Sequence, residues 1–199
     1  MRVRPLCATA FLCAALTIQG CATAHDPPAQ ATTAAAPDLG TIDQVLESPA
    51  TAQLAASFLR SQHPPTTAEN APHLRRTGTP VMVYATNLEF ATDPDSPLST
   101  AGTPSYIAVP TRIDPRTDTD TTQLTPTPPY TPQAIATGTE ESQVAQALPT
   151  NANLLLDYPS HTWFAWTETR VTAISSSTNT DLKGREFDTK QFKKWLMSR

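Results

Sequence analysis

The chain has 199 residues and a formal net charge of −4, a length that allows one domain with a hydrophobic core plus tails. Its 20 prolines, about twice the average usage, argue against a helical bundle and favour long loops and edge strands. All four lysines lie in the last seventeen residues, so residues 183–199 carry a net charge of +4 and residues 22–182 a net charge of −10. An acidic body of this kind argues against a nucleic-acid-binding surface.

The first twenty residues have the pattern of a secretory signal peptide. Two arginines precede an apolar run of thirteen residues, Leu6–Ile18, which is too short to span a bilayer as a permanent helix. The run ends in the sequence IQGC, which resembles the processing box of bacterial lipoproteins. A branched residue lies three positions before the cysteine and the small Gly20 directly before it, whereas Gln19 departs from the pattern. The resemblance covers this segment alone. It implies that residues 1–20 are removed and that Cys21 is diacylated at the new N-terminus.

A second cleavage site competes with the first. Residues 22–24 form an A-x-A site, at which ordinary signal peptidase would release a soluble protein beginning at His25. The other two cysteines lie inside the leader, so the mature chain holds Cys21 or no cysteine and forms no internal disulfide. A lone cysteine beside a signal boundary is better explained as a lipid attachment point than as a free extracellular thiol.

Lipidation at Cys21 would place the protein on the extracytoplasmic side of a cell membrane or outer membrane. Ala22 is not aspartate, so the retention signal of inner-membrane lipoproteins is absent. Residues 21–40 should form a lipidated, flexible tether, because they contain no aromatic side chain and consist mostly of Ala, Thr, Pro and Asp. Residues 41–199 should then form a single domain.

The first helical signals lie between Thr41 and Leu59. Thr41 and Gln44 have the spacing of a capping box, and Ser48 then precedes a proline at the first position of a second helical stretch. Apolar residues recur at helical spacing as far as Leu59. The sequence HPP, residues 63–65, should end the helix, because a residue before proline is pushed out of the α region.

The spacing of the apolar residues changes to two after residue 80. Residues 81–90 and 106–113 alternate and should pair as antiparallel strands, with Pro110 making the second an edge strand or a bulged one. Residues 114–138 hold little core-forming sequence, so we expect a Thr/Pro-rich loop there. O-glycosylation is an alternative role for its threonines.

The remaining elements alternate between short strands and helices. A short helix is expected over residues 139–148, a strand over 154–156 and a turn over 158–161. Residues 162–175 make the longest predicted β segment. Asp188 should cap a final helix.

These elements predict an α+β fold with a small antiparallel sheet of about four strands. An N-terminal helix and a short C-terminal helix would flank the sheet, and antiparallel pairing is favoured because no βαβ spacing recurs. A cystatin-like or NTF2-like cone would suit this order. That comparison is an analogy at the level of the fold, with no motif behind it.

Three polar residues of the predicted turn, Asp157, Ser160 and His161, are of the types that build a hydrolytic triad. Such a triad needs a base within hydrogen-bond reach of the nucleophile and a third group that orients the base. These residues lack a G-x-S-x-G elbow, and turn formation alone accounts for the Asp and Ser. We therefore assign no catalytic residue.

The sequence predicts no metal site and no cofactor. The other three histidines have neither helical i, i+4 spacing nor a neighbouring cysteine pair, which a zinc site would need: His25, His63, His73. Several loop acids could offer oxygens to calcium but lack the glycine turn and terminal glutamate of a calcium loop: Asp93, Asp95, Asp114, Asp118, Asp120.

Aromatic residues near the turn form the candidate binding surface: Tyr158, Trp163 and Trp166. Alternation places the two tryptophans on opposite faces of the sheet. In a one-sided sheet only one of them can be core, so the other should be covered by a helix or exposed as a binding anchor.

The final helix needs a surface on which to bury Phe192, Trp195 and Leu196, because about ten residues form a marginal helix alone in water. The default is the protein's own sheet. The alternative is an anionic membrane surface or a partner, contacted by Trp195 and by the basic residues Lys190, Lys193 and Lys194.

Taken together, the sequence predicts a membrane-anchored lipoprotein whose domain binds a protein partner or serves as an accessory subunit of an envelope assembly. Its expected partners are the membrane, through the lipid, and an envelope protein, with no nucleic acid. The alternative is a secreted or envelope enzyme, such as a hydrolase, with an unrecognised site.

Overall fold

The computed structural model describes residues 37–62 and 71–199, all within one compact unit of the chain. The predicted signal peptide, Cys21, His25, His63 and the tether as far as residue 36 lie outside the described residues.

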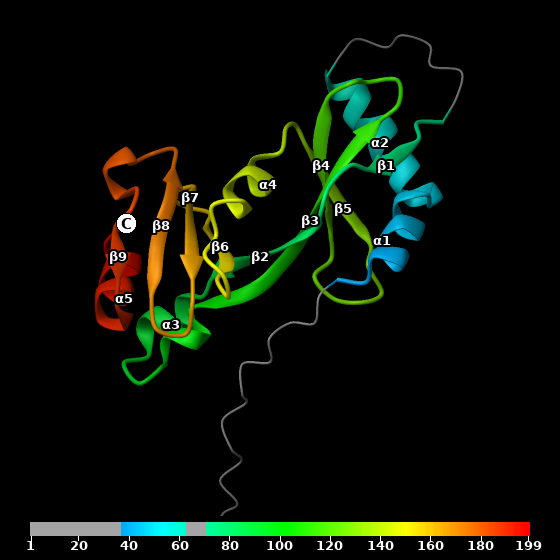
Figure 1. Cartoon of the computed structure of the whole chain (residues 1–199). Helices are drawn as coiled ribbons and strands as arrows, with labels where there is room; N and C mark the ends of the chain where they lie inside the picture. Colours follow the sequence, from blue (N-terminus) through cyan, green and yellow to red (C-terminus); the bar gives the residue numbers. More distant parts are fainter. Residues whose placement is uncertain (1–36, 63–70) are drawn as a thin grey trace, which may run out of the picture. The chain divides into compact units, whose positions relative to one another are not determined.

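The described residues form nine strands in one mixed sheet, in the order β5-β4-β3-β2-β6-β7-β8-β9, with β1 paired to β3 (Figure 1). The parallel pair is β2 with β6, and every other pair is antiparallel. The strands are β1 Leu74–Arg76, β2 Val81–Thr86, β3 Gly102–Ile113, β4 Thr119–Leu124, β5 Pro132–Ala136, β6 Asn153–Asp157, β7 Thr162–Trp166, β8 Val171–Ser176 and β9 Glu186–Phe187.

Five α-helices and two 3₁₀ turns complete the described part of the chain. They are α1 Leu39–Leu46, α2 Pro49–Gln62, α3 Leu88–Thr92, η1 Leu98–Thr100, α4 Glu140–Ala145, η2 Thr180–Leu182 and α5 Thr189–Ser198. The prediction of a small antiparallel sheet of about four strands, and with it the cystatin-like or NTF2-like cone, is therefore wrong.

The largest error lies in residues 114–138, which were expected to be a loop and instead contain β4 and β5. The β4 sequence TDTTQL has no apolar alternation, yet Thr121 and Thr122 are buried. Their hydroxyls are satisfied inside the protein: Thr122 Oγ1 lies 2.8 Å from Thr111 Oγ1, and Thr121 Oγ1 donates to the Gly138 carbonyl at 2.8 Å. Threonine is β-branched, so it forms a strand wherever hydrogen bonds replace the missing apolar burial.

Pro110 does not mark an edge strand, because β3 is paired on both sides. β1 and β2 follow each other along one side of β3, at residues 111–113 and 102–108, and β4 lies on the other side. Pro110 faces the connection between β1 and β2, where no ladder bond needs the missing N–H. Its carbonyl accepts a bond from the Thr77 amide at 2.8 Å, and a Cβ at Gly78 would lie 3.2 Å from its ring.

Two other strands end earlier than alternation predicted. Asn87 accepts a bond from the Glu89 amide at 3.0 Å and caps α3, so the predicted strand 81–90 ends at Thr86. The predicted strand 162–175 is a hairpin of β7 and β8, because the Thr167 hydroxyl accepts a bond from the Arg170 amide at 3.1 Å and closes a turn. Polar turns without glycine or proline are hard to recognise in sequence.

The first helix also begins earlier than expected. Asp38 accepts a bond from the Gly40 amide at 3.1 Å and caps α1, so residues 39–40 belong to a helix rather than to a tether. The predicted cap at Ser48 is confirmed, because its hydroxyl accepts a bond from the Thr51 amide at 3.2 Å.

Both faces of the sheet carry a hydrophobic cluster. One face is covered by α1 and α2 over β1, β3 and β4, and by α3 and α5 over β2, β6, β7 and β8, with Met82 touching both clusters. The opposite face carries Val83, Leu154, Leu156 and Trp163 against Val144 of α4. When both faces of a sheet are buried, its strands lack the alternation of apolar and polar residues by which a strand is recognised in a sequence.

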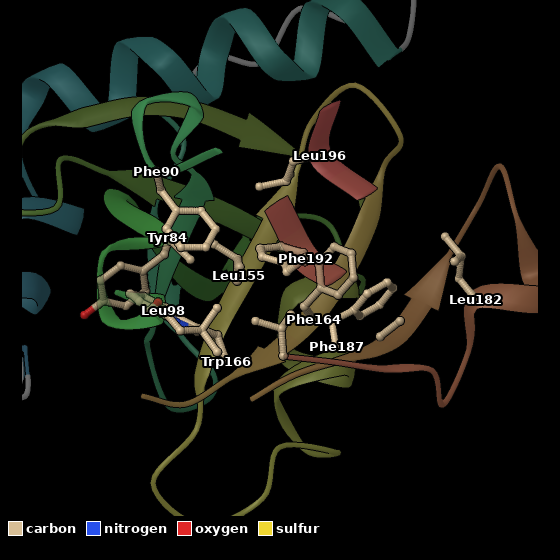
Figure 2. Close-up of a cluster of buried hydrophobic side chains, with 13 residues drawn as sticks. Tyr84, Phe90, Leu98, Leu155, Phe164, Trp166, Leu182, Phe187, Phe192 and Leu196 are labelled. Atoms are coloured by element: carbon tan, nitrogen blue, oxygen red, sulfur yellow. The ribbon is translucent and has the colours of Figure 1, made fainter. Parts of the chain in front are cut away.

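The final helix packs on the protein's own sheet, as the default interpretation expected. Its predicted cap is confirmed, with a full capping box between Asp188 and Gln191. Figure 2 shows Phe192 and Leu196 of α5 in the cluster with Phe164 and Phe187, and both α5 side chains are buried. Ring centroids of Phe164 and Phe192 lie 5.4 Å apart in an edge-to-face arrangement.

The basic side chains of α5 have different roles. Lys193 Nζ donates to the carbonyls of Asp93, Pro94 and Ser96 at 2.6, 3.0 and 2.9 Å, so its ammonium group is held by the turn that follows α3. Lys190 and Lys194 are exposed. Their role as contacts stays a prediction.

We predict that Trp195→Ala lowers the free energy of unfolding by about 2–4 kcal/mol, because its half-buried ring stacks on Phe192 at 5.8 Å and meets Phe164 at 5.1 Å. Urea unfolding measures the change, and Lys194→Ala is the exposed control, with an effect below about 0.5 kcal/mol. Unchanged unfolding together with lost liposome binding would instead assign Trp195 to a membrane.

Candidate functional site

A groove of about 570 Å³ lies between α1 and the segment that runs from β1 toward β2. Asp43, Leu46 and Glu47 of α1 line one side, and residues 74–79 line the other. A volume of this size is typical of a binding site, in the range of about 300–1,000 Å³.

An ion pair ties α1 to β1 at this groove. Arg76 Nε donates to Asp43 Oδ1 at 2.8 Å, and its Nη2 donates to Asp43 Oδ2 at 2.9 Å. The ion pair is therefore bidentate, with one bond to each carboxylate oxygen. The hydrogen bonds from Arg76 lower the pKa of Asp43. Ile42 and Leu46, on the neighbouring positions of α1, are buried against the sheet and hold the helix above β1. The two walls of the groove therefore have a fixed separation.

Among the residues that the structure describes, the backbone of β1 is paired along one edge only. The Asp114 amide donates to the His73 carbonyl at 2.9 Å, and the Thr77 amide donates to the Pro110 carbonyl at 2.8 Å. In an antiparallel ladder, residues alternate between facing the partner strand and facing away from it. Leu74 and Arg76 therefore point their N–H and C=O groups away from β3. Within residues 37–62 and 71–199, β3 is the sole strand paired with β1.

The predicted aromatic binding surface does not exist as such. Trp163 is 2 % exposed and Trp166 6 % exposed, on opposite faces as alternation predicted, but α4 covers one face and α3 with α5 the other. Their indole N–H groups donate to Glu140 Oε1 and to the Leu98 carbonyl, each at 2.9 Å. Tyr158 alone is exposed, with its hydroxyl 3.1 Å from Ser105 Oγ.

The polar residues of the predicted turn form a structural cluster, without the geometry of a triad. Ser160 Oγ lies 2.6 Å from Asp157 Oδ2, whereas His161 Nε2 lies 3.3 Å from Glu140 Oε2. The histidine is thus paired away from the serine, and the carboxylate that accepts the serine's hydrogen bond is itself held by Arg199. The geometry gives these three residues no catalytic arrangement.

Asp157 is instead the centre of a buried ion pair. Its carboxylate is fully buried and accepts bonds from Arg199 Nε at 2.7 Å and from Thr86 Oγ1 at 2.9 Å, with Arg199 Nη2 at 2.6 Å. Burial by itself would raise the pKa of Asp157, but the bonds from Arg199, Ser160 and Thr86 outweigh burial and lower it. This pair joins the ends of β2 and β6 to the last residue after α5.

Three of the predicted loop acids, Asp93, Asp118 and Asp120, have structural partners. Asp120 is buried beside Arg116, with Arg116 Nε 3.3 Å from its Oδ2, and Asp93 accepts bonds from Asp95 and Ser96. In the part of the chain that the structure describes, no group of three or more His, Cys, Asp or Glu side chains is arranged to hold a metal ion.

Comparisons with known protein families, curated proteins and solved structures found no match to this chain. None of the described helices has the length and apolar character needed to cross a membrane. Sequence reasoning missed the groove residues. The only local signal was the short sequence LRR at residues 74–76, which is too brief to predict a strand.

We predict that acid destabilises the protein partly through Asp157. Its pKa is lowered below the ordinary value of 3.8, so its contribution is fully present above that value and is lost as the pH falls through the folded-state pKa. Asp157→Asn should lower the free energy of unfolding at pH 7 by about 3–5 kcal/mol, because Arg199 loses its buried partner. It should also flatten the dependence of stability on pH below about pH 4.

Denaturant unfolding between pH 2 and pH 7 checks both effects. Asp181→Asn, an exposed aspartate, is the matched control and should leave the curve in place. An unaltered pH slope in the Asp157→Asn variant would contradict the role of the ion pair.

Proposed function

We propose that this chain is a lipid-anchored extracytoplasmic lipoprotein whose domain binds a protein partner in an envelope assembly. The anchoring part rests on the sequence IQGC, residues 18–21, and on Cys21 as the sole cysteine after the leader. The binding part rests on the groove between α1 and β1.

The observation that carries the binding proposal is the unpaired edge of β1 at the groove. Leu74 and Arg76 each present an N–H and a C=O away from β3, and both residues line the groove. Such an edge is complementary to the backbone of another extended chain, which can add a strand to the sheet. The proposed occupant is therefore an extended segment of a partner protein.

The rigidity of the groove supports the same conclusion. The two-point Arg76–Asp43 ion pair and the buried side chains of Ile42 and Leu46 hold α1 in place, so binding orders little of the domain itself. A preformed site of this kind loses less conformational entropy when a partner binds. The partner's main chain would supply most of the contacts, and side-chain selection would come from the α1 wall, where Glu47 is exposed.

We predict that mass spectrometry of the mature protein will find a diacylglyceryl group on Cys21. Cys21→Ser should move the protein from the membrane fraction to the soluble fraction without changing its melting temperature, because the described fold begins at residue 37. An unmodified mature chain beginning at His25 would overturn the anchoring proposal.

We also predict that a photo-crosslinking residue at Thr79, in the groove, captures one partner protein in intact cells. Peptide mapping should place the cross-link in a single continuous segment of that partner. The matched control is the same residue at Thr178, which is exposed and outside the groove. Thr79→Trp should fill the groove and abolish co-purification after mild detergent extraction, whereas Thr178→Trp should not. Equal capture at both positions, or co-purification that survives Thr79→Trp, would contradict the proposed site.

A further inference from the structure

Two arginines lie directly opposite each other on adjacent strands. The β1–β3 register pairs Arg75 with Arg112, and the flanking bonds at His73–Asp114 and Thr77–Pro110 fix that register. Directly opposed residues in an antiparallel pair point to the same face of the sheet, with Cα atoms about 5.5 Å apart in a hydrogen-bonded pair. The side chain of Arg75 therefore shares a face with that of Arg112, opposite to the face on which Arg76 meets Asp43.

Like charges in this arrangement destabilise a sheet unless something neutralises them. The arginines that form ion pairs within the described residues are Arg76, Arg116, Arg170 and Arg199, and neither Arg75 nor Arg112 is among them. Asp114, which directly follows β3, is exposed and forms no ion pair with either arginine among the described residues. The pair stands out further because residues 22–182 carry a net charge of −10.

Arg112 is held in position by the protein. Its Nε is buried and has no hydrogen-bond partner in the described part of the chain, and the residue as a whole is partly exposed. Arg75 is exposed. One guanidinium is thus partly enclosed and the other free to close over a ligand from the solvent side.

We propose that Arg75 and Arg112 bind a phosphate group. Two guanidinium forks offer more donors than one carboxylate can accept, and a tetrahedral phosphate presents enough oxygens to engage both. The neighbouring side chains on this face add hydroxyl donors, with Thr119 opposite Arg112 in the β3–β4 register and Thr77 following Arg75 on the same face. Arg75 and Thr77 also line the α1 groove, whereas Arg112 and Thr119 do not, and phosphate binding is measured without a partner so that the two proposals are tested separately.

The test measures binding of inorganic phosphate to the processed chain by calorimetry in a low-salt, phosphate-free buffer. Arg75→Gln and Arg112→Gln should each weaken binding by about tenfold or more, because each removes a charge-assisted pair of bonds. Arg75→Lys should also weaken it, because an ammonium lacks the fork. Arg60→Gln is the control, since Arg60 is exposed on α2 and bonds only Ser57 among the described residues.

A second measurement covers the case in which Arg112→Gln fails to fold. In the absence of phosphate, Arg75→Gln should raise the melting temperature at low salt by removing the repulsion, and added salt should erase the difference. Phosphate should raise the melting temperature of the wild type and not that of Arg75→Gln.

Vesicles separate the two sources of phosphate. The Cys21→Ser chain is mixed with vesicles of phosphatidylglycerol or of phosphatidylcholine, with and without Arg75→Gln. Binding to phosphatidylglycerol that requires Arg75 identifies a lipid headgroup, and binding of inorganic phosphate without vesicle binding identifies a soluble phosphate. Either result supports the site. No binding in either arm, or equal binding by Arg75→Gln and Arg60→Gln, overturns it.

Discussion

The parallel pairing of β2 with β6 is the contact on which the whole sheet depends. It joins two antiparallel parts, β5-β4-β3-β2 with β1 on one side and β6-β7-β8-β9 on the other. Three register pairs make this seam: Val83 with Leu154, Tyr84 with Leu155, and Ala85 with Leu156. Parallel pairing is slightly less stable per residue than antiparallel pairing. A seam of three residue pairs therefore needs support from side chains. That support comes from both faces, because the residues of the seam alternate between two separate hydrophobic clusters.

The N-terminus of α4 bridges the same seam through two adjacent carboxylates. Glu141 accepts a bond from the Tyr106 hydroxyl of β3 at 3.0 Å, and Glu140 accepts one from the Trp163 indole of β7 at 2.9 Å. Burial, together with Glu141, raises the pKa of Tyr106, so the hydroxyl stays protonated and remains a donor. Acidic residues in the first turn of a helix also interact favourably with its dipole. On the opposite face, the Asp157–Arg199 pair ties the ends of β2 and β6 to α5. Polar contacts thus reinforce the seam from both sides.

The two proposed binding features both follow from the position of β1. This three-residue strand continues the line of β2 along β3, beyond the start of β6. Among the described residues it therefore has one partner strand, and its other edge is unpaired. The same short pairing places Arg75 opposite Arg112. The packing of buried apolar side chains does not require these two arginines to be adjacent. A strand that contributes so little to the core is free to carry charged and unpaired groups, and it is a natural location for recognition.

The sequence by itself determined the local elements whose signals are short-range. The Ser48 cap, the Asp188 cap and the opposite faces of Trp163 and Trp166 all follow from hydrogen bonding or side-chain alternation within a few residues. The proposed lipoprotein signal is likewise a local pattern, and it stays a prediction because it lies outside the described residues. The tertiary structure decided the size of the sheet, the pairing of β2 with β6 and the existence of the groove. These depend on residues far apart in the chain: Thr111 with Thr122 makes a polar strand buriable, Asp43 with Arg76 fixes a helix over β1, and Asp157 with Arg199 closes the seam. Such long-range partners produce no periodic pattern in the sequence. Each residue of a pair is an ordinary polar residue by itself, and only the fold brings the two together.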